Sequence, residues 1–528
     1  VKEAVATMRQ GDTAMKLGLY RAALEYYGRT LESLDSYRGE RLDVALANAT
    51  NAYTSLSIGS LYLELNLFEQ ASTALEEART TILSIEDRAA EATVTALLGD
   101  LQFALRDYNS AEGSYRQAIR LGEQSGNVRA EALGLRGIGA ILVATEDGTE
   151  LQIQENYERA LDRMRSISDV DGIRRVFLSM GESALLQNDL ENAITYFAEA
   201  RDNADEVGDL RNAAYATLRL AYTYTLDPDD PQGIGATRTY EQALVQFREQ
   251  DEYEGEGLAL QGLGELAMRR SQYATAIEYF QQMESAFNNA ENLRGQAQAK
   301  ILIGRAQQDQ RRLDLALDSY NEALCMLQSF ADVTESVGQA EEAEQCLQDN
   351  EIDLRDPLVD VRLGRLARAE GLRARGDIYR ELEIYTLAED DLSRAEAMID
   401  GLALNDLAQG RILASSGDLA LDLNQFQDAR QRFENVRAIG VRLRDLSTQG
   451  LGEYGLARLY TADPEETDIG EEERTYSRVL ELFRNQAPNP ALARQVAVSL
   501  AESFALRGRF QDAETWYLTA RNEAVEAV

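Results

Sequence analysis

One pattern of small and aromatic residues returns along nearly the whole chain at intervals of about forty residues. It is clearest around Gly99, which is followed by Tyr108, Ala111, Tyr115 and Ala118. Residues three or four apart lie on one face of an α-helix, so the pattern predicts two amphipathic helices joined by a turn. Each such pair is too small to bury its apolar face alone and must pack against its neighbours. The repeat therefore favours one elongated helical array over several compact domains.

The small residue of the predicted first helix provides a reference for aligning the copies. The twelve reference residues are Gly11, Gly59, Gly99, Gly139, Gly181, Ala221, Gly264, Gly304, Gly376, Gly417, Gly455 and Ala501. The chain has only 6 prolines, which fits long, uninterrupted helices because proline breaks a helix interior.

The predicted second helix of every copy carries an aromatic residue or leucine, followed three residues later by a small or apolar residue. The pairs are Tyr27/Thr30, Leu75/Ala78, Tyr115/Ala118, Tyr157/Ala160, Phe197/Ala200, Tyr240/Ala243, Phe280/Met283, Tyr320/Ala323, Leu392/Ala395, Phe433/Val436, Tyr476/Val479 and Tyr517/Ala520. This spacing puts both members on one helical face, which we expect to be buried against the first helix.

These features resemble the tetratricopeptide repeat (TPR), in which a small residue on the first helix and alanines on the second let the helices pack closely. The interval is longer than the roughly thirty-four residues of the commonest TPR. It is similar to the arrays of kinesin light chains and of many bacterial regulators and surface proteins. The resemblance implies an all-α fold, a right-handed superhelical α-solenoid of about twelve helix pairs that presents a surface for binding other proteins.

The array departs from its regular interval at several places. The longest departure lies between Gly304 and Gly376 and predicts three segments: a TPR array in residues 1–330, an acidic insertion in 331–357 and a second array in 358–528. Three turns between first and second helices are also lengthened, in residues 146–151, 227–235 and 461–473. Their glycine, proline and acidic residues are typical of solvated turns.

The two cysteines flank the start of the insertion. Cys325 lies late in the second helix of the eighth copy, and Cys346 lies within the insertion. In a reducing compartment both would act as small apolar residues, whereas in an oxidising one they could form a disulfide that pins the insertion to the array. The sequence leaves both alternatives open.

The charge balance restricts the partners. Lysine and arginine total 53 against 91 aspartates and glutamates, a net charge of -38, which repels nucleic acid and anionic membranes. No run of residues reaches the roughly 20 apolar positions that a membrane span needs. The chain starts at Val1 without an initiator methionine, which is compatible with removal of a leader. We therefore favour export or a cell-surface location over the cytoplasm.

No motif in the sequence predicts an enzyme, a metal site or a cofactor. Histidine is absent, which excludes histidine-based catalysis and histidine metal ligation. A Gly-x-Gly-x-x-Gly match at Gly450, Gly452 and Gly455 lacks the strand that a dinucleotide-binding loop requires, and Gly455 is already a reference glycine. The acidic turns lack the spacing of a helix-loop-helix calcium site. We expect no active site and no cofactor.

The remaining candidate for function is the concave face that first helices form in a TPR array. The first-helix positions expected to point inward carry Arg136, Arg175, Arg269, Arg305, Arg373, Arg411, Tyr53 and Tyr215. Arginines among them, from the seventh to the tenth copies, could together bind an acidic peptide. The alternative is that they are solvated, or paired with acidic residues of the same face such as Glu370. The lysine and asparagine set with which some TPR proteins bind chaperone C-termini is missing.

Three functions remain open from the sequence. The first is a non-catalytic scaffold that binds other proteins or peptides. The second is self-assembly, because the last predicted helix leaves the apolar residues Tyr517 and Leu518 to be covered by another copy or by further sequence. The third is the regulatory region of a longer chain, since similar bacterial arrays are joined to effectors such as caspase-like proteases.

Overall fold

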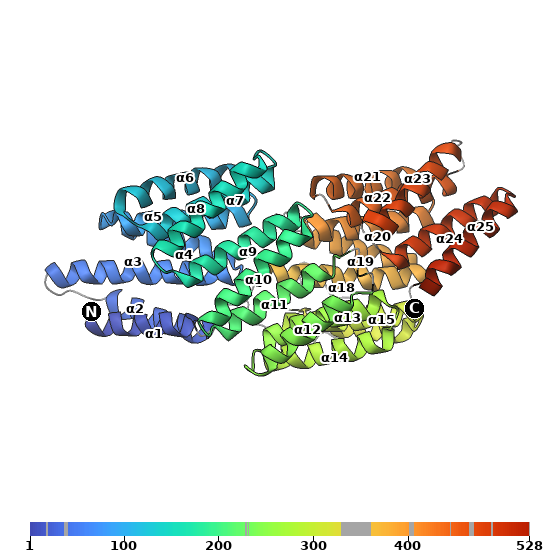
Figure 1. The fold of residues 1–528 in the computed structure, drawn as a ribbon. Helices are drawn as coiled ribbons and strands as arrows, with labels where there is room; N and C mark the ends of the chain where they lie inside the picture. Colours follow the sequence, from blue (N-terminus) through green and yellow to red (C-terminus); the bar gives the residue numbers. More distant parts are fainter. Residues whose placement is uncertain are drawn as a thin grey trace. The chain divides into compact units, whose positions relative to one another are not determined.

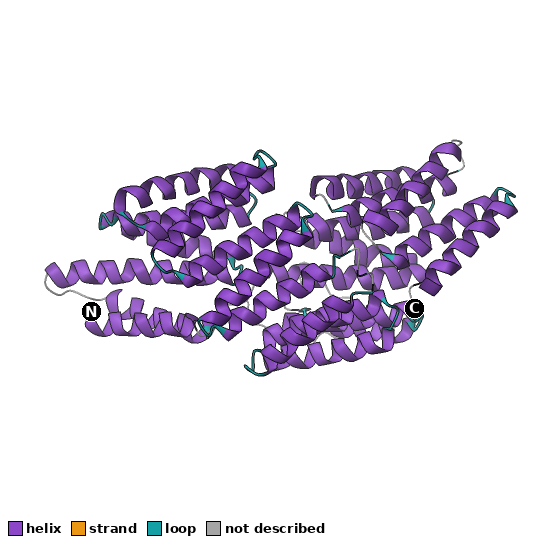
Figure 2. Ribbon diagram, viewed as in Figure 1, coloured by secondary structure: helices purple, strands orange, loops and turns teal. Residues whose placement is uncertain are grey.

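The computed structural model describes residues 1–16, 19–35, 41–227, 230, 232–328, 361–400, 406–443, 445–463, 469–486 and 489–526. Within these ranges the secondary structure is helical, with no strand, as Figure 2 shows. The predicted all-α, helical-repeat fold is therefore confirmed. None of the described helices combines the length and the apolar character needed to cross a membrane.

The chain divides into two compact units. Unit 1 contains Val1–Arg219 and unit 2 begins at Leu220, so the division falls inside one helix, α11. The insertion predicted in residues 331–357 lies outside the described residues. The predicted boundaries at 330 and 358 therefore stay a prediction.

Unit 1 is a succession of helices that ends within α11 (Figure 1). These are α1 (Lys2–Lys16), α2 (Tyr20–Asp35), α3 (Arg41–Glu64), α4 (Phe68–Ser84), α5 (Arg88–Ala104), α6 (Tyr108–Ser125), α7 (Val128–Thr145), α8 (Glu150–Ser166), α9 (Val170–Leu186), α10 (Leu190–Glu206) and α11 (Leu210–Tyr224).

Unit 2 continues the same pattern through its described residues. Its helices are α12 (Ile234–Arg248), α13 (Tyr253–Arg269), α14 (Tyr273–Asn289), α15 (Leu293–Asp309), α16 (Leu313–Met326), α18 (Val361–Glu381), α19 (Tyr385–Ile399), α20 (Asp406–Asp422), α21 (Phe426–Leu443), α22 (Leu446–Ala462), α23 (Ile469–Glu481), a short π-helix (Leu482–Gln486), α24 (Pro490–Leu506) and α25 (Phe510–Glu526).

Consecutive helices pack as pairs, from α1 with α2 to α9 with α10 in unit 1 and from α13 with α14 to α24 with α25 in unit 2. The first helices of successive pairs also touch, as α5 touches α7 and α7 touches α9. Short acidic or amide side chains define many helix starts. Asp107 accepts a hydrogen bond from the backbone of Ser110 at the start of α6, and Asn127 accepts one from Ala130 at the start of α7. Such caps satisfy amides that have no partner within the helix.

The reference glycines allow the close approach of the two helices in a pair. A Cβ atom added at Gly99 would lie 2.7 Å from the ring of Tyr115, so only glycine fits there. Eight further pairs have a reference glycine that faces the matching second-helix side chain: Gly11–Tyr27, Gly59–Leu75, Gly139–Tyr157, Gly181–Phe197, Gly264–Phe280, Gly304–Tyr320, Gly376–Leu392 and Gly417–Phe433. Gly455 differs, because a Cβ atom there would meet Phe433 of the preceding pair.

The predicted second-helix side chains form the core, with one exception. Tyr27, Phe197 and Phe280 are fully buried. The prediction was wrong for Tyr517, whose exposed fraction is 44%. Its neighbour Trp516 packs against the buried cluster instead, because a one-residue change rotates a helical side chain by about 100°.

Two further sequence features have a structural explanation. The three predicted turns fall between α7 and α8, α11 and α12, and α22 and α23, but residues 150–151, 234–235, 461–462 and 469–473 are helical, and residues 228–229, 231 and 464–468 lie outside the described ranges. Gly450, Gly452 and Gly455 all lie buried inside α22 and not in a loop. A Cβ atom at Gly452 would lie 2.4 Å from the backbone nitrogen of Arg437, so this glycine lets α22 pack closely on α21.

Candidate functional site

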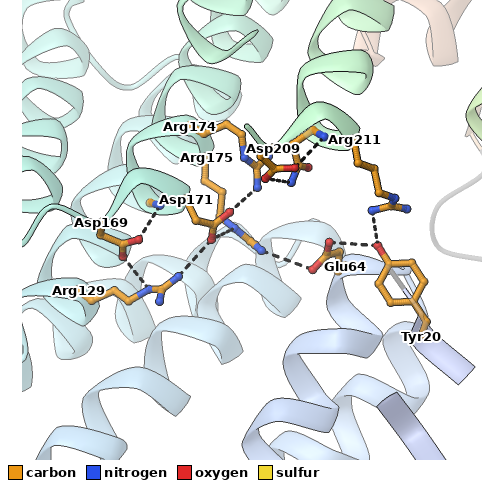
Figure 3. A network of polar contacts seen from close by, with 11 residues as sticks. Tyr20, Glu64, Arg129, Asp169, Asp171, Arg174, Arg175, Asp209 and Arg211 are labelled. Atoms are coloured by element: carbon orange, nitrogen blue, oxygen red, sulfur yellow. Dashed lines mark hydrogen bonds and ion pairs between the residues drawn. The ribbon is translucent and has the colours of Figure 1, made fainter. Parts of the chain in front are cut away.

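A polar network lies within unit 1, where the N-termini of α9 and α11 face α2 and the end of α3 (Figure 3). Its labelled members are Tyr20, Glu64, Arg129, Asp169, Asp171, Arg174, Arg175, Asp209 and Arg211. They come from five helices and the turns before them, so the network depends on how the pairs of unit 1 stack.

The start of α9 contributes the acidic centre of this network. Asp169 caps the helix by accepting a hydrogen bond from Gly172 N at 3.0 Å, and it forms an ion pair with Arg129 at 3.1 Å. Asp171 contacts Arg129 at 3.2 Å, Arg175 at 3.0 Å and also Arg174. Partial burial favours the neutral form of Asp171, but the charges of Arg175 and Arg174 outweigh it and lower its pKa to about 2.

Four side chains link the start of the unit with its end, and we call Tyr20, Glu64, Arg175 and Arg211 the long-range bridge. The hydroxyl of Tyr20 donates to Glu64 Oε1 at 3.3 Å, and Arg175 Nη2 lies 3.5 Å from Glu64 Oε2. Arg211 Nη1 donates to the Tyr20 hydroxyl at 3.0 Å. Burial, followed by the charge of Glu64, raises the pKa of Tyr20. The bridge therefore holds α2 and α3 beside α9 and α11 through side chains.

Arg211 lies between two aromatic rings. Its guanidinium carbon is 5.3 Å from the ring centre of Tyr20 and 5.0 Å from that of Tyr215. Both distances fall within the range of favourable cation–π contact. The predicted residue Tyr215 thus belongs to the surroundings of the bridge.

Two other predicted residues of unit 1 have carboxylate partners elsewhere. Arg136 forms an ion pair with Asp100 at 2.6 Å, and the same carboxylate accepts from the Tyr115 hydroxyl at 2.7 Å. Tyr53 donates to Asp87 at 2.7 Å. Burial and this hydrogen bond raise the pKa of Tyr53 to about 12.

In unit 2, two predicted arginines share one carboxylate. Arg373 contacts Glu370 at 2.9 Å and Asp377 at 2.7 Å, and Arg411 Nε donates to Glu370 at 2.9 Å. Burial disfavours the charged form of Glu370, but Arg373 and Arg411 outweigh it and lower its pKa. Burial raises the pKa of Asp377. Both arginines are therefore already neutralised within unit 2.

The two remaining predicted arginines of unit 2, Arg269 and Arg305, make fewer polar contacts. Arg269 donates to the backbone oxygen of Thr225 at 3.0 Å, and burial lowers its pKa. Arg305 is exposed and makes no hydrogen bond or ion pair to any residue in the described ranges. Cys325 lies in α16, while Cys346 lies outside the described residues, so the disulfide stays a prediction.

No protein-family model matches the sequence, and no curated protein matches it. Solved structures do align with the chain. A Rap protein complexed with competence and sporulation factor has a TM-score of 0.47 and 14% identity, covering 75% of this chain and 99% of that one. The apo form of the quorum sensor NprR from B. thuringiensis has a TM-score of 0.44 and 15% identity, covering 76% and 99%.

A third aligned structure is a signal-transduction ATPase with a TPR sensor from Pyrococcus horikoshii, with a TM-score of 0.40, 16% identity, and coverage of 61% of this chain and 47% of that one. Likeness at this level carries no argument about function. The repeated contact between a first-helix glycine and a second-helix ring decides the architecture. The chain is a TPR-like helical-repeat protein.

The predicted site residues of the TPR-like array are divided between the two units. Arg136, Arg175, Tyr53 and Tyr215 belong to unit 1, and Arg269, Arg305, Arg373 and Arg411 belong to unit 2. Sequence reasoning missed Tyr20, Glu64 and Arg211. Tyr20 begins a second helix and Glu64 ends a first helix, so neither occupies the inward-pointing repeat positions. No local signal marks them, because their partners lie between 44 and 191 residues away in the sequence.

The arginine and tyrosine side chains of these sites are suited to contacts with charged groups. Arginine presents several donors in a planar fork that matches carboxylates, and tyrosine adds an aromatic face and a hydroxyl. Within the described ranges, no group of three or more acidic or cysteine side chains has the arrangement of a metal site. The first helices of each unit thus carry arginines paired with carboxylates, and those of unit 1 also carry tyrosines.

Proposed function

We propose that this TPR-like protein is a non-catalytic scaffold that binds other proteins or peptides through the first-helix faces of its units. The observation that carries the proposal is the network of unit 1, in which arginines from α7, α9 and α11 converge with carboxylates and with Tyr20 of α2. Arginine and tyrosine are among the side chains enriched at the centres of protein interfaces.

The way the helix pairs pack supports the same proposal. Many of their apolar side chains are buried between neighbouring helices, as the rings of Tyr115 and Phe280 are. The surface left over within each unit extends over several repeats and offers separate contact points. Such a surface suits a partner that binds along several repeats, with affinity from many modest contacts.

Site-specific photo-crosslinking tests the scaffold proposal. A photoreactive amino acid replaces Tyr53 on first helix α3 or, as the matched control, Leu83 on second helix α4, both of which are exposed. After irradiation in the native source, we expect one defined protein or peptide to be attached at position 53 and not at position 83. Equal labelling at both positions, or no attached polypeptide at either, would contradict the proposal.

Self-assembly is a second candidate, favoured by exposed apolar side chains on α24 and α25. Leu506 and Phe510 have exposed fractions of 79% and 71%, and Tyr517 and Leu518 lie on the same helix pair. Exposed apolar area of this kind is typical of interfaces. If copies associate through it, light scattering should show a mass above that of the monomer that falls on Leu506→Ser and Phe510→Ser substitution. A monomer at every concentration would exclude this candidate.

A further inference from the structure

The four carboxylates of the unit 1 network lie at helix ends that differ in how favourable they are for a negative charge. Asp169 and Asp209 each precede a helix and accept a backbone hydrogen bond, from Gly172 and Asn212 respectively. Asp171 lies in the first turn of α9. Negative charge is favourable at a helix N-terminus and unfavourable at a C-terminus. Glu64 is the last residue of α3, so it is the one carboxylate of the four at an unfavourable end.

The contacts of Glu64 are also the longest in the long-range bridge. They measure 3.3 Å to the Tyr20 hydroxyl and 3.5 Å to Arg175. Hydrogen bonds between charged groups are normally about 2.7–2.9 Å long. The side chains of Arg175 and Glu64 have exposed fractions of 35% and 32%, so water weakens their attraction further. Glu64 is therefore the most replaceable member of the network.

Removing Glu64 from the network would leave an excess of positive charge. Figure 3 labels four arginines and four carboxylates, and Asp169, Asp171 and Asp209 remain fixed at helix starts. Without Glu64, Arg175 Nη2 and the Tyr20 hydroxyl both become donors without an acceptor. Donors of this kind, one of them charged, match an incoming carboxylate.

We propose that Glu64 holds the place of a partner's carboxylate: an acidic segment of a partner protein binds between Arg175 and Tyr20, displaces Glu64 and thereby releases α3 from α9. This inference rests on the proposed scaffold function and names both the partner chemistry and the contact that competes with it. Displacement breaks the contact of Glu64 with Arg175, whereas the hydrogen bond from Arg211 to Tyr20 remains, so binding is coupled to release of the end of α3.

The large negative charge of the chain does not prevent such binding. The net charge of -38 is spread over 528 residues, and physiological salt screens charges that lie farther than about 8 Å from the site. Within contact distance, Arg175 and the Tyr20 hydroxyl determine whether a carboxylate binds. The competition is therefore local, between Glu64 and the partner's carboxylate.

A labelled hexaglutamate peptide tests this proposal by fluorescence anisotropy with the full chain. Glu64→Gln removes the competing charge, and we expect the peptide to bind about fivefold more tightly than to the unaltered chain. Glu112→Gln is the matched control, because Glu112 pairs with Arg116 on α6 and not with the bridge. It changes the net charge by the same amount and should leave the affinity unchanged.

Substitution of Arg175 on the Glu64→Gln background identifies the binding residue. Arg175→Gln should abolish the gain, and Arg175→Lys, which retains the charge without the fork, should remove part of it. If circular dichroism shows that Arg175→Gln has lost helix content, the affinity of the Arg175→Lys variant tests the role of Arg175 instead. The inference would be overturned if the peptide did not bind Glu64→Gln, or bound it no more tightly than Glu112→Gln. It would also be overturned if neither Arg175 substitution changed the affinity of Glu64→Gln. The scaffold proposal has its own test in the crosslinking at position 53, so the two can fail separately.

Discussion

Arg211 Nη1 in α11 donates a hydrogen bond of 3.0 Å to the hydroxyl of Tyr20 in α2, across 191 residues of sequence. The same guanidinium lies over the Tyr20 ring. Most contacts in a helical-repeat protein join neighbouring repeats, so this one carries information that the repeat pattern lacks. It shows that the pairs of unit 1 curve until the sixth first helix reaches the first pair.

Replacing Arg211 by alanine should loosen the start of α2. The substitution removes the hydrogen bond to Tyr20 and the contacts with two rings, and we expect the free energy of unfolding to fall by about 1 kcal/mol. Hydrogen–deuterium exchange should become faster in the first turns of α2. Arg116→Ala is the control, because Arg116 pairs with Glu112 in its own helix. Unchanged exchange in α2 of the Arg211→Ala variant would show that the bridge does not restrain it.

Glycine-to-alanine substitutions at two sites should have opposite effects on stability. At Gly99 the new methyl group meets the buried ring of Tyr115 at 2.7 Å, and we expect a loss of about 1–3 kcal/mol. At Gly113 on α6 nothing lies within 4 Å, so alanine should stabilise the helix by about 0.5–1 kcal/mol. Urea denaturation of the two variants measures both changes. Equal effects at the two sites would contradict the packing role of the reference glycines.

Partial burial of Tyr53, together with its hydrogen bond to Asp87, should make the free energy of unfolding depend on pH in the alkaline range. The pKa of Tyr53 rises from 10.0 to about 12 in the folded protein. A raised pKa stabilises the fold below the unfolded value, so this contribution is complete below pH 10 and is lost as pH rises towards 12. The difference in unfolding free energy between the unaltered chain and Tyr53→Phe should therefore shrink over that interval.

Asp87→Asn provides the control for the Tyr53 experiment. It keeps a side chain that can cap α5 but removes the charge beside the Tyr53 hydroxyl. The pH dependence attributable to Tyr53 should weaken in this background. If the Tyr53→Phe difference stays constant from pH 9 to 12 in the unaltered chain, the hydroxyl makes no such contribution.

Second-helix aromatics should differ in their effect on stability according to burial. Phe433 is 1% exposed and lies against both Gly417 and Gly455, so Phe433→Ala should cost about 3–5 kcal/mol. Tyr517 occupies the equivalent sequence position but is 44% exposed, and Tyr517→Ala should change stability by no more than about 0.5 kcal/mol. Thermal or denaturant unfolding checks the contrast. A large loss at Tyr517 would mean that its ring is covered in solution.

Much of the fold could be predicted because the decisive contacts are local. Gly99 meets Tyr115 within a single helix pair, and the same relationship holds at Gly181 and Phe197. The error at Tyr517 arose from assigning the buried position by alignment, since Trp516 next to it satisfies the same apolar pattern. The predicted arginines lie on first helices, and the pairing with Glu370 was one of the two alternatives that the sequence left open; the partner of Arg136, Asp100, lies on the preceding first helix α5.

The sequence by itself determined the helices, their pairing and the residues at which they pack, because each of these depends on spacings of three to forty residues. Only the tertiary structure decided that Glu64 meets Arg175 and that Arg211 meets Tyr20. The physical reason is that such meetings depend on the small rotation between neighbouring pairs, summed over several repeats. Each rotation reflects the packing of whole helix faces, and their sum brings distant charges into contact.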